Sequence, residues 1–194
     1  DALIMEQRPV ELRYGVLHAG EFRYRTYGNP TVCTEPFLDC PGASRWEIAM
    51  ETIRILVERG ESCLVFVRDR NESRRGAELL ARRVQIPAAA HAMTALRKLE
   101  PTHSRDALLN LLSCGVAFHN ADLSLEERAL VEQAFRHGEL RIIVSTSTLA
   151  AGMNLPAQNV LIASEKWRYD ARFGMPWRTP ILRAEFENMG GRAG

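Results

Sequence analysis

The sequence has almost no net charge. Its 25 lysines and arginines face 24 aspartates and glutamates, which leaves a formal charge of +1 at pH 7. This balance excludes binding to nucleic acid or membranes through a general basic surface, so any contact with phosphate groups must be local. The sequence also lacks an apolar run long enough to cross a membrane and a signal-peptide pattern at its start. We therefore expect a cytoplasmic location and no membrane partner.

Recognisable metal and catalytic motifs are also missing. The four cysteines form no CxxC pair and have no histidine at zinc-finger spacing, so no metal site is expected within the chain. Gly15 and Gly20 have the spacing of a phosphate loop, but Glu21 and Phe22 stand where Lys and Ser or Thr are required. G-x-S-x-G, HExxH and EF-hand patterns are absent. By these motifs, the sequence identifies no activated nucleophile.

What the sequence does contain is enough apolar residues for a core, 46% of 194 positions. Apolar and polar residues alternate on each side of His18-Ala19-Gly20, which predicts an antiparallel hairpin. Two later helices are each predicted by an S-x-x-E capping box at the start and a glycine directly after the end. The residues of these boxes and stops are Ser44, Glu47 and Gly60, and Ser124, Glu127 and Gly138.

The rest of the chain alternates apolar strands with helices. Strands are predicted at 64–67, 116–118, 140–145 and 160–163, and further helices at 73–84 and 95–112, the last interrupted at Pro101. Strands that are apolar on both faces and are joined by helices indicate a parallel sheet covered on both sides. The predicted fold class is therefore α/β.

Polar residues follow three of these strands, at 68–71, 119–122 and 145–148. Ligands of open parallel sheets bind beyond the carboxyl ends of the strands, where hydroxyl and backbone N–H groups at helix starts can hold phosphate. Taken singly, the same residues are ordinary caps and turns. His119 alone is typical of a structural histidine, and Arg68 and Arg70 alone are typical of a solvated face.

Four stretches in order carry a resemblance to a known family. "LVFVRDR" resembles helicase motif IV, "VAFHNADLS" motif IVa, "STSTLAAGMNLPA" motif V and "ENMGGRAG" motif VI. Together they strongly resemble the second RecA-like domain of superfamily 2 DExH-box helicases, in the branch with archaeal-type DNA repair helicases and exosome-associated RNA helicases. The resemblance implies a RecA-like parallel sheet over residues 31–194, truncated within motif VI, preceded over residues 1–30 by an antiparallel hairpin that enters from the interdomain linker.

The resemblance also implies roles for single residues. Contacts to the backbone of DNA or RNA are expected from Arg70, His119, Thr146 and Thr148. Contacts to the nucleotide are expected from Gly152, Asn154, Asn188, Gly191 and Arg192. Arg192 would be catalytic, as an arginine finger on the ATP phosphates, because its permanently charged fork stabilises the transferred phosphoryl group.

Two departures from the family pattern affect this expectation. Asn188 stands where the family usually has Gln, and a second arginine is expected directly after Gly194. The phosphate loop and the DExH box would lie in an N-terminal RecA-like domain of the same protein, which would bind most of the ATP with Mg²⁺. We therefore expect these residues to be an excised half of an ATP-dependent helicase, inactive in isolation.

Two other classes of function stay open at this point. The same polar edge could belong to a non-catalytic module that binds nucleic acid or protein. Alternatively, the chain could be a stand-alone α/β enzyme with Cys63 or Cys114 as nucleophile, although neither cysteine has a recognisable base partner and both adjoin apolar runs typical of buried thiols.

Overall fold

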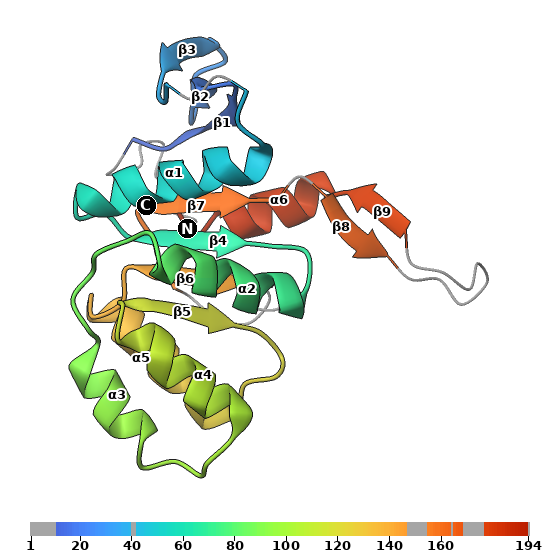
Figure 1. Ribbon diagram of the computed structural model, residues 1–194. Coiled ribbons are helices and arrows are strands. Elements are labelled where there is room, and N and C mark those ends of the chain that lie inside the picture. Colours follow the sequence, from blue (N-terminus) through green and yellow to red (C-terminus); the bar gives the residue numbers. More distant parts are fainter. Residues whose placement is uncertain (1–10, 40–41, 147–154, 164, 169–176, 194) are drawn as a thin grey trace, which may run out of the picture.

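A computed structural model describes residues 11–39, 42–146, 155–163, 165–168 and 177–193 (Figure 1). An antiparallel sheet comes first, with β1 (Arg13–His18), β2 (Glu21–Thr26) and β3 (Cys33–Pro36) in the order β1-β2-β3. Both turn residues between β1 and β2 have left-handed backbones, with φ of 49° at Ala19 and 86° at Gly20. Such two-residue turns match the twist of a hairpin, so the predicted hairpin is confirmed.

The third strand extends this sheet past the predicted boundary at residue 30. β3 pairs with β2 along its length. A further antiparallel pair, β8 (Glu165–Arg168) with β9 (Trp177–Pro180), projects to the right beside α6 in Figure 1. Neither β3 nor this pair was predicted.

The central sheet has four parallel strands in the order β5-β6-β4-β7. They are β4 (Cys63–Phe66), β5 (Val116–His119), β6 (Ile142–Ser145) and β7 (Asn159–Ile162). Every residue of β4, β5 and β6 is buried, which explains why these strands are apolar on both faces. The predicted parallel α/β sheet is confirmed.

Six helices are described, and their bounds are α1 (Arg45–Glu58), α2 (Arg70–Ala81), α3 (Ala90–Leu96), α4 (His103–Leu112), α5 (Leu125–Arg136) and α6 (Arg183–Gly190). The chain moves from β4 outward to β5 through α2, α3 and α4, and back to β6 through α5. Right-handed crossovers in opposite directions place α2 and α5 on opposite faces of the sheet. None of the described helices is long and apolar enough to cross a membrane.

The predicted helix ends agree with the structure in α1 and α5. Both capping boxes are formed, and both stop glycines have left-handed backbones, with φ of 83° at Gly60 and 74° at Gly138. By contrast, α2 starts at Arg70 and not at Ser73, because the carboxylate of Asp69 accepts the Glu72 N–H at 2.8 Å. The predicted interruption at Pro101 separates α3 from α4.

The core lies on both faces of the central sheet. Its largest fully buried side chains come from strands, helices and the segments before β6 and β7: Met50, Ile53, Leu64, Leu80, Leu96, Leu108, Leu112, Phe118, Leu140, Ile142, Ile143 and Leu155. Burial of each such side chain stabilises the fold by about 1.5–3 kcal/mol. The core therefore fixes the strand ends, where the polar residues lie.

Candidate functional site

The three predicted polar clusters meet at the carboxyl edge of the central sheet. Phe66 and His119, the last residues of β4 and β5, are both in register with Ser145, the last residue of β6. The next residues continue the contact, because Val67 N–H donates to the Ser145 carbonyl at 2.8 Å and Thr146 N–H to the His119 carbonyl at 3.3 Å. The loops after β4, β5 and β6 therefore leave the sheet side by side.

Arg70 lies at this edge, at the start of α2. Its Nη1 atom is 2.6 Å from Oδ1 of Asp122, and both side chains are more than half exposed. Asn120, which is buried, holds the two loops together from below: its Nδ2 lies 3.0 Å from Ser73 Oγ and 3.3 Å from the Arg70 carbonyl, and its Oδ1 accepts the Asp122 N–H at 2.9 Å. Sequence reasoning placed Asn120 and Asp122 at this edge but missed their connection to Arg70.

A neighbouring arginine at this edge has a different environment. Arg68 Nη2 lies 2.7 Å from Oε1 of Glu72, and the Arg68 backbone N–H donates to the same carboxylate at 2.9 Å. Glu72 lies in the first turn of α2, so this pair is local and braces the start of the helix. Arg68 is therefore part of the helix cap.

His119 is buried, unlike Arg70. Its side chain is only 6% exposed, and its Nε2 atom lies 2.8 Å from Oε1 of Glu132, a buried residue of α5. Burial lowers the pKa of His119, and the Glu132 carboxylate opposes this shift only in part. The predicted nucleic-acid contact of His119 stays a prediction, and the side chain as placed does not reach solvent.

Of the two predicted threonine contacts after β6, Thr146 and Thr148, the structure describes only Thr146. Thr146 is 7% exposed, and Ser145 Oγ lies 2.9 Å from both the His119 and the Thr146 carbonyls, which fixes the end of β6. Thr148, Gly152 and Asn154 lie outside the described residues.

The motif VI residues lie at the opposite end of the sheet. Ala157 N–H, two residues before β7, donates to the Arg192 carbonyl at 2.8 Å, and Ala157 forms a parallel bridge with Ala193. Five residues of strand rise separate Ala157 from the carboxyl end of β7, roughly 16 Å. Asn188 and Gly191 are exposed on and after α6, and Arg192 is half-buried. The structure thus separates the predicted nucleotide residues Asn188, Gly191 and Arg192 from Arg70 and Thr146.

The segment 147–154 connects these two ends. Thr146 leaves the carboxyl end of β6, whereas Leu155 is fully buried and leads into the bridge at Ala157. The predicted motif V therefore begins at one end of the sheet and finishes at the other.

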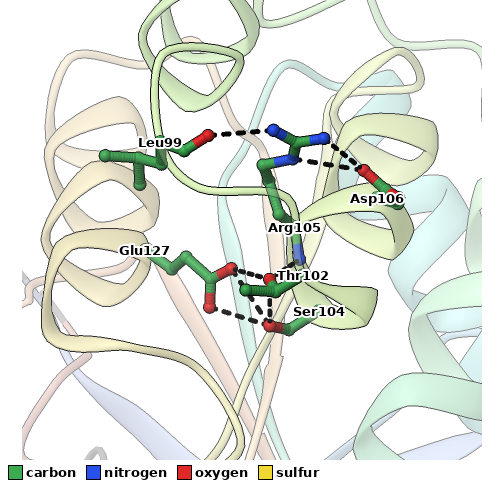
Figure 2. Close-up of polar contacts among 6 residues, drawn as sticks. All are labelled: Leu99, Thr102, Ser104, Arg105, Asp106 and Glu127. Atoms are coloured by element: carbon green, nitrogen blue, oxygen red, sulfur yellow. Dashed lines mark hydrogen bonds and ion pairs between the residues drawn. The ribbon is translucent and has the colours of Figure 1, made fainter.

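A hollow of about 300 Å³ adjoins the Arg70–Asp122 pair. It is lined by Arg74, His103, Ser104, Phe118, Asn120 and Asp122. Ser104, which lines the hollow, is tied to α5, because Glu127 accepts hydrogen bonds from Thr102 Oγ1 at 2.9 Å and Ser104 Oγ at 3.0 Å, as Figure 2 shows. These bonds hold the start of α4 against the start of α5 beside the hollow.

Two kinds of independent chemistry, a nucleophilic Cys63 and a metal site, find little support in the described residues. Cys63 is a fully buried free thiol, as predicted, and burial raises its pKa to about 12. Such a thiol is unreactive at neutral pH, which argues against Cys63 as a nucleophile. Within the described ranges, no group of three His, Cys, Asp or Glu side chains could hold a metal ion.

Comparison with known proteins agrees with this arrangement. Residues 45–194 match the helicase conserved C-terminal domain family. The ATP-dependent DNA helicase Hel308 of Pyrobaculum calidifontis is 38% identical over 194 residues, which cover 96% of this chain and 25% of that protein. The protein of the same name from Pyrococcus horikoshii is 37% identical over 191 residues, 96% of this chain and 24% of its own length. That from Aeropyrum pernix is 47% identical over 89 residues, 46% of this chain and 11% of its own.

The chain thus spans about a quarter of the length of the relatives that match nearly all of it. The family match covers the whole central sheet, from α1 through the motif VI residues, and the fold is the parallel α/β sheet that the motifs imply. On these grounds the chain belongs to the helicase conserved C-terminal domain family.

Proposed function

We propose that this chain is the second RecA-like motor domain of an ATP-dependent DNA helicase of superfamily 2, of the DExH-box type. Relatives named as ATP-dependent DNA helicases match nearly the whole chain, which supports DNA as the substrate. The observation that carries the proposal is that the described ends of the motif V stretch, Thr146 and Leu155 to Ala157, lie at opposite ends of the parallel sheet. Motif V would thus have a DNA contact near one end of the sheet and a nucleotide contact near the other.

The DNA contact is assigned to the carboxyl edge. The exposed Arg70 would hold a backbone phosphate there, with Thr146, Thr148 and His119 as the further contacts that the motifs imply and the rim of the adjacent hollow as an additional surface. Contacts of this kind bind without reading base sequence, which suits a motor that moves along DNA. The low net charge of the chain is compatible with this because the donors are gathered at one edge.

The nucleotide contact is assigned to Arg192, supported by Gly152, Asn154, Asn188 and Gly191. The main chain of Arg192 is tied to the sheet through Ala157, and its half-exposed side chain has the charge and planar shape that fit a phosphate group. ATP supplies the phosphoryl group on which charge develops, and an arginine at this place would stabilise that charge. Mg²⁺ and the phosphate loop would belong to an N-terminal RecA-like partner domain, in a cytoplasmic protein.

The proposal predicts a division of labour between two domains. The 194-residue chain alone should bind single-stranded DNA weakly and should not hydrolyse ATP. A protein that also contains the partner domain should hydrolyse ATP, and single-stranded DNA should stimulate the reaction. ATP turnover by the purified 194-residue chain, or a two-domain protein whose ATP turnover ignores DNA, would contradict the proposal.

A further inference from the structure

We propose that Asp122 competes with nucleic-acid phosphates for Arg70 and so sets how tightly the carboxyl edge holds its strand. The inference rests on the proposed function, because it concerns the same edge. The proposed function names residues that bind the strand, and the inference adds one residue, Asp122, that opposes this binding.

The geometry of the pair supports competition. Arg70 Nη1 lies 2.6 Å from Asp122 Oδ1, within the range of a strong charge-assisted hydrogen bond. The side chains are 61% and 52% exposed, so a strand that reaches Arg70 also meets the carboxylate. A phosphate must therefore displace Asp122 or share the guanidinium with it, against repulsion between two negative groups.

The carboxylate is held in position by a buried scaffold. Asn120 is 2% exposed and accepts the Asp122 N–H at 2.9 Å, while its Nδ2 bonds to Ser73 Oγ at 3.0 Å and contacts the Arg70 carbonyl at 3.3 Å. Ser73 Oγ in turn donates to the Arg70 carbonyl at 2.8 Å. The two loops come from positions 52 residues apart, yet one buried amide fixes them both. Asp122 is thus pre-positioned beside Arg70.

The other arginines of this edge are paired differently. Arg68 and Arg74 pair with Glu72 and Glu78, which lie four residues further along the chain on α2. These pairs are local to the helix, whereas Asp122 reaches Arg70 from the loop after β5 and also lines the hollow beside it. Loss of the Asp122 charge should therefore alter the nucleic-acid edge with little effect on helix α2.

For a motor that moves along DNA, this competition would make binding of the strand at Arg70 weaker and more easily reversed. A phosphate bound at Arg70 leaves Asp122 unpaired next to it, so the bound state is weakened and the free state is restored at once by the internal carboxylate. A strand held in this way exchanges more easily than one held by an unpaired arginine.

The test measures binding of the 194-residue chain to a fluorescent 15-nucleotide oligothymidylate by anisotropy at several salt concentrations. Asp122→Asn keeps the shape of the side chain and the backbone N–H bond to Asn120 but removes the charge. We expect about two- to fivefold tighter binding at low salt, in line with the free energy of an exposed ion pair. The gain should shrink as salt increases.

Two further variants separate specific competition from a general charge effect. Glu58→Gln removes an exposed carboxylate that pairs with Arg54 on α1, before β4 and so at the opposite end of the sheet, and it should leave the affinity nearly unchanged. In an Arg70→Ala background, Asp122→Asn should give no more gain than Glu58→Gln, because nothing remains to compete for. Circular dichroism melting of each variant shows that it is folded.

The outcomes distinguish this inference from the proposed function. If the wild-type chain binds and Arg70→Ala weakens binding, but Asp122→Asn has no effect or keeps its gain without Arg70, the inference is overturned and the proposed function stands. If the folded wild-type chain does not bind the oligonucleotide, or Arg70→Ala binds as tightly as the wild type, the proposed contact fails and the inference fails with it.

Discussion

Nε2 of His119 lies 2.8 Å from Oε1 of Glu132, and the two side chains are 6% and 5% exposed. A neutral imidazole that donates its Nε2 proton to the carboxylate leaves Nδ1 as an acceptor, and Nδ1 is a buried atom without a hydrogen-bond partner in the described part of the chain. Protonation would add a buried N–H at Nδ1 with nothing to accept it. The pair therefore connects β5 to α5 in the neutral form of the histidine.

This pair makes the stability depend on pH. The pKa of His119 is lowered by burial from its ordinary value of 6.5, so the unfolded chain binds the proton more readily than the folded chain. The free energy of unfolding is therefore highest, as far as His119 is concerned, above about pH 6.5. It decreases as the pH falls below this value, by at most about 1.4 kcal/mol per pH unit. We expect the midpoint temperature of thermal unfolding to decrease as the pH is lowered from 6.5 to 5.5.

The matched variants are His119→Gln and His91→Gln. His91 is also near a carboxylate, Glu139, but its side chain is 93% exposed. His119→Gln should flatten the pH dependence between 6.5 and 5.5, and His91→Gln should leave it unchanged. An equal slope in the wild type and His119→Gln would show that the buried pair is not responsible.

Glu127 should be more important for stability than the corresponding residue of the other capping box. Glu127 forms the capping box of α5 with Ser124. Its carboxylate also accepts hydrogen bonds from Thr102 and Ser104 at the start of α4, so its removal leaves several polar groups unpaired (Figure 2). We expect Glu127→Ala to lower the free energy of unfolding by about 2–3 kcal/mol. The control is Glu47→Ala, which breaks an exposed box and should cost about 1 kcal/mol. Equal losses in urea denaturation would argue against the buried network.

Two glycines with the same backbone conformation should differ in their tolerance of alanine. Gly115 (φ 65°) and Gly138 (φ 74°) both have left-handed backbones, which cost alanine about 1–2 kcal/mol. A Cβ at Gly115 would lie 2.3 Å from Cγ2 of Ile86, whereas nothing lies within 4 Å at Gly138. We expect Gly138→Ala to cost about 1 kcal/mol and Gly115→Ala about 3 kcal/mol or more. Equal unfolding midpoints for the two variants would contradict the packing at Gly115.

Much of the fold could be predicted because its signals are local. The capping boxes of α1 and α5 and their stop glycines occupy fixed offsets in the sequence, and the apolar strands follow directly from composition. β3 could not be predicted in the same way, since its four residues depend on pairing with β2 for their strand conformation. The start of α2 was missed although Asp69 and Glu72 have the spacing of a cap, because the apolar periodicity begins later.

The site was only partly predictable, for a related reason. Residues after the strands were expected at one edge from parallel topology alone, and Arg70 and Thr146 lie there. The order of the strands, the burial of His119 against Glu132 and the approach of Asp122 to Arg70 depend on contacts between elements. The separation of Arg192 from Arg70 depends on the bridge at Ala157, which no local pattern indicates.

If the two ends of the sheet serve two ligands, Arg192→Ala and Arg70→Ala should have different effects in a protein that contains this chain and its partner domain. The measurement is ATP turnover at saturating single-stranded DNA together with DNA affinity for each variant. We expect Arg192→Ala to lower turnover by about 10³-fold while DNA affinity stays within about twofold. Arg70→Ala should weaken DNA binding and leave turnover at saturating DNA nearly unchanged. Wild-type turnover in Arg192→Ala, or equal loss of both properties in both variants, would contradict the account.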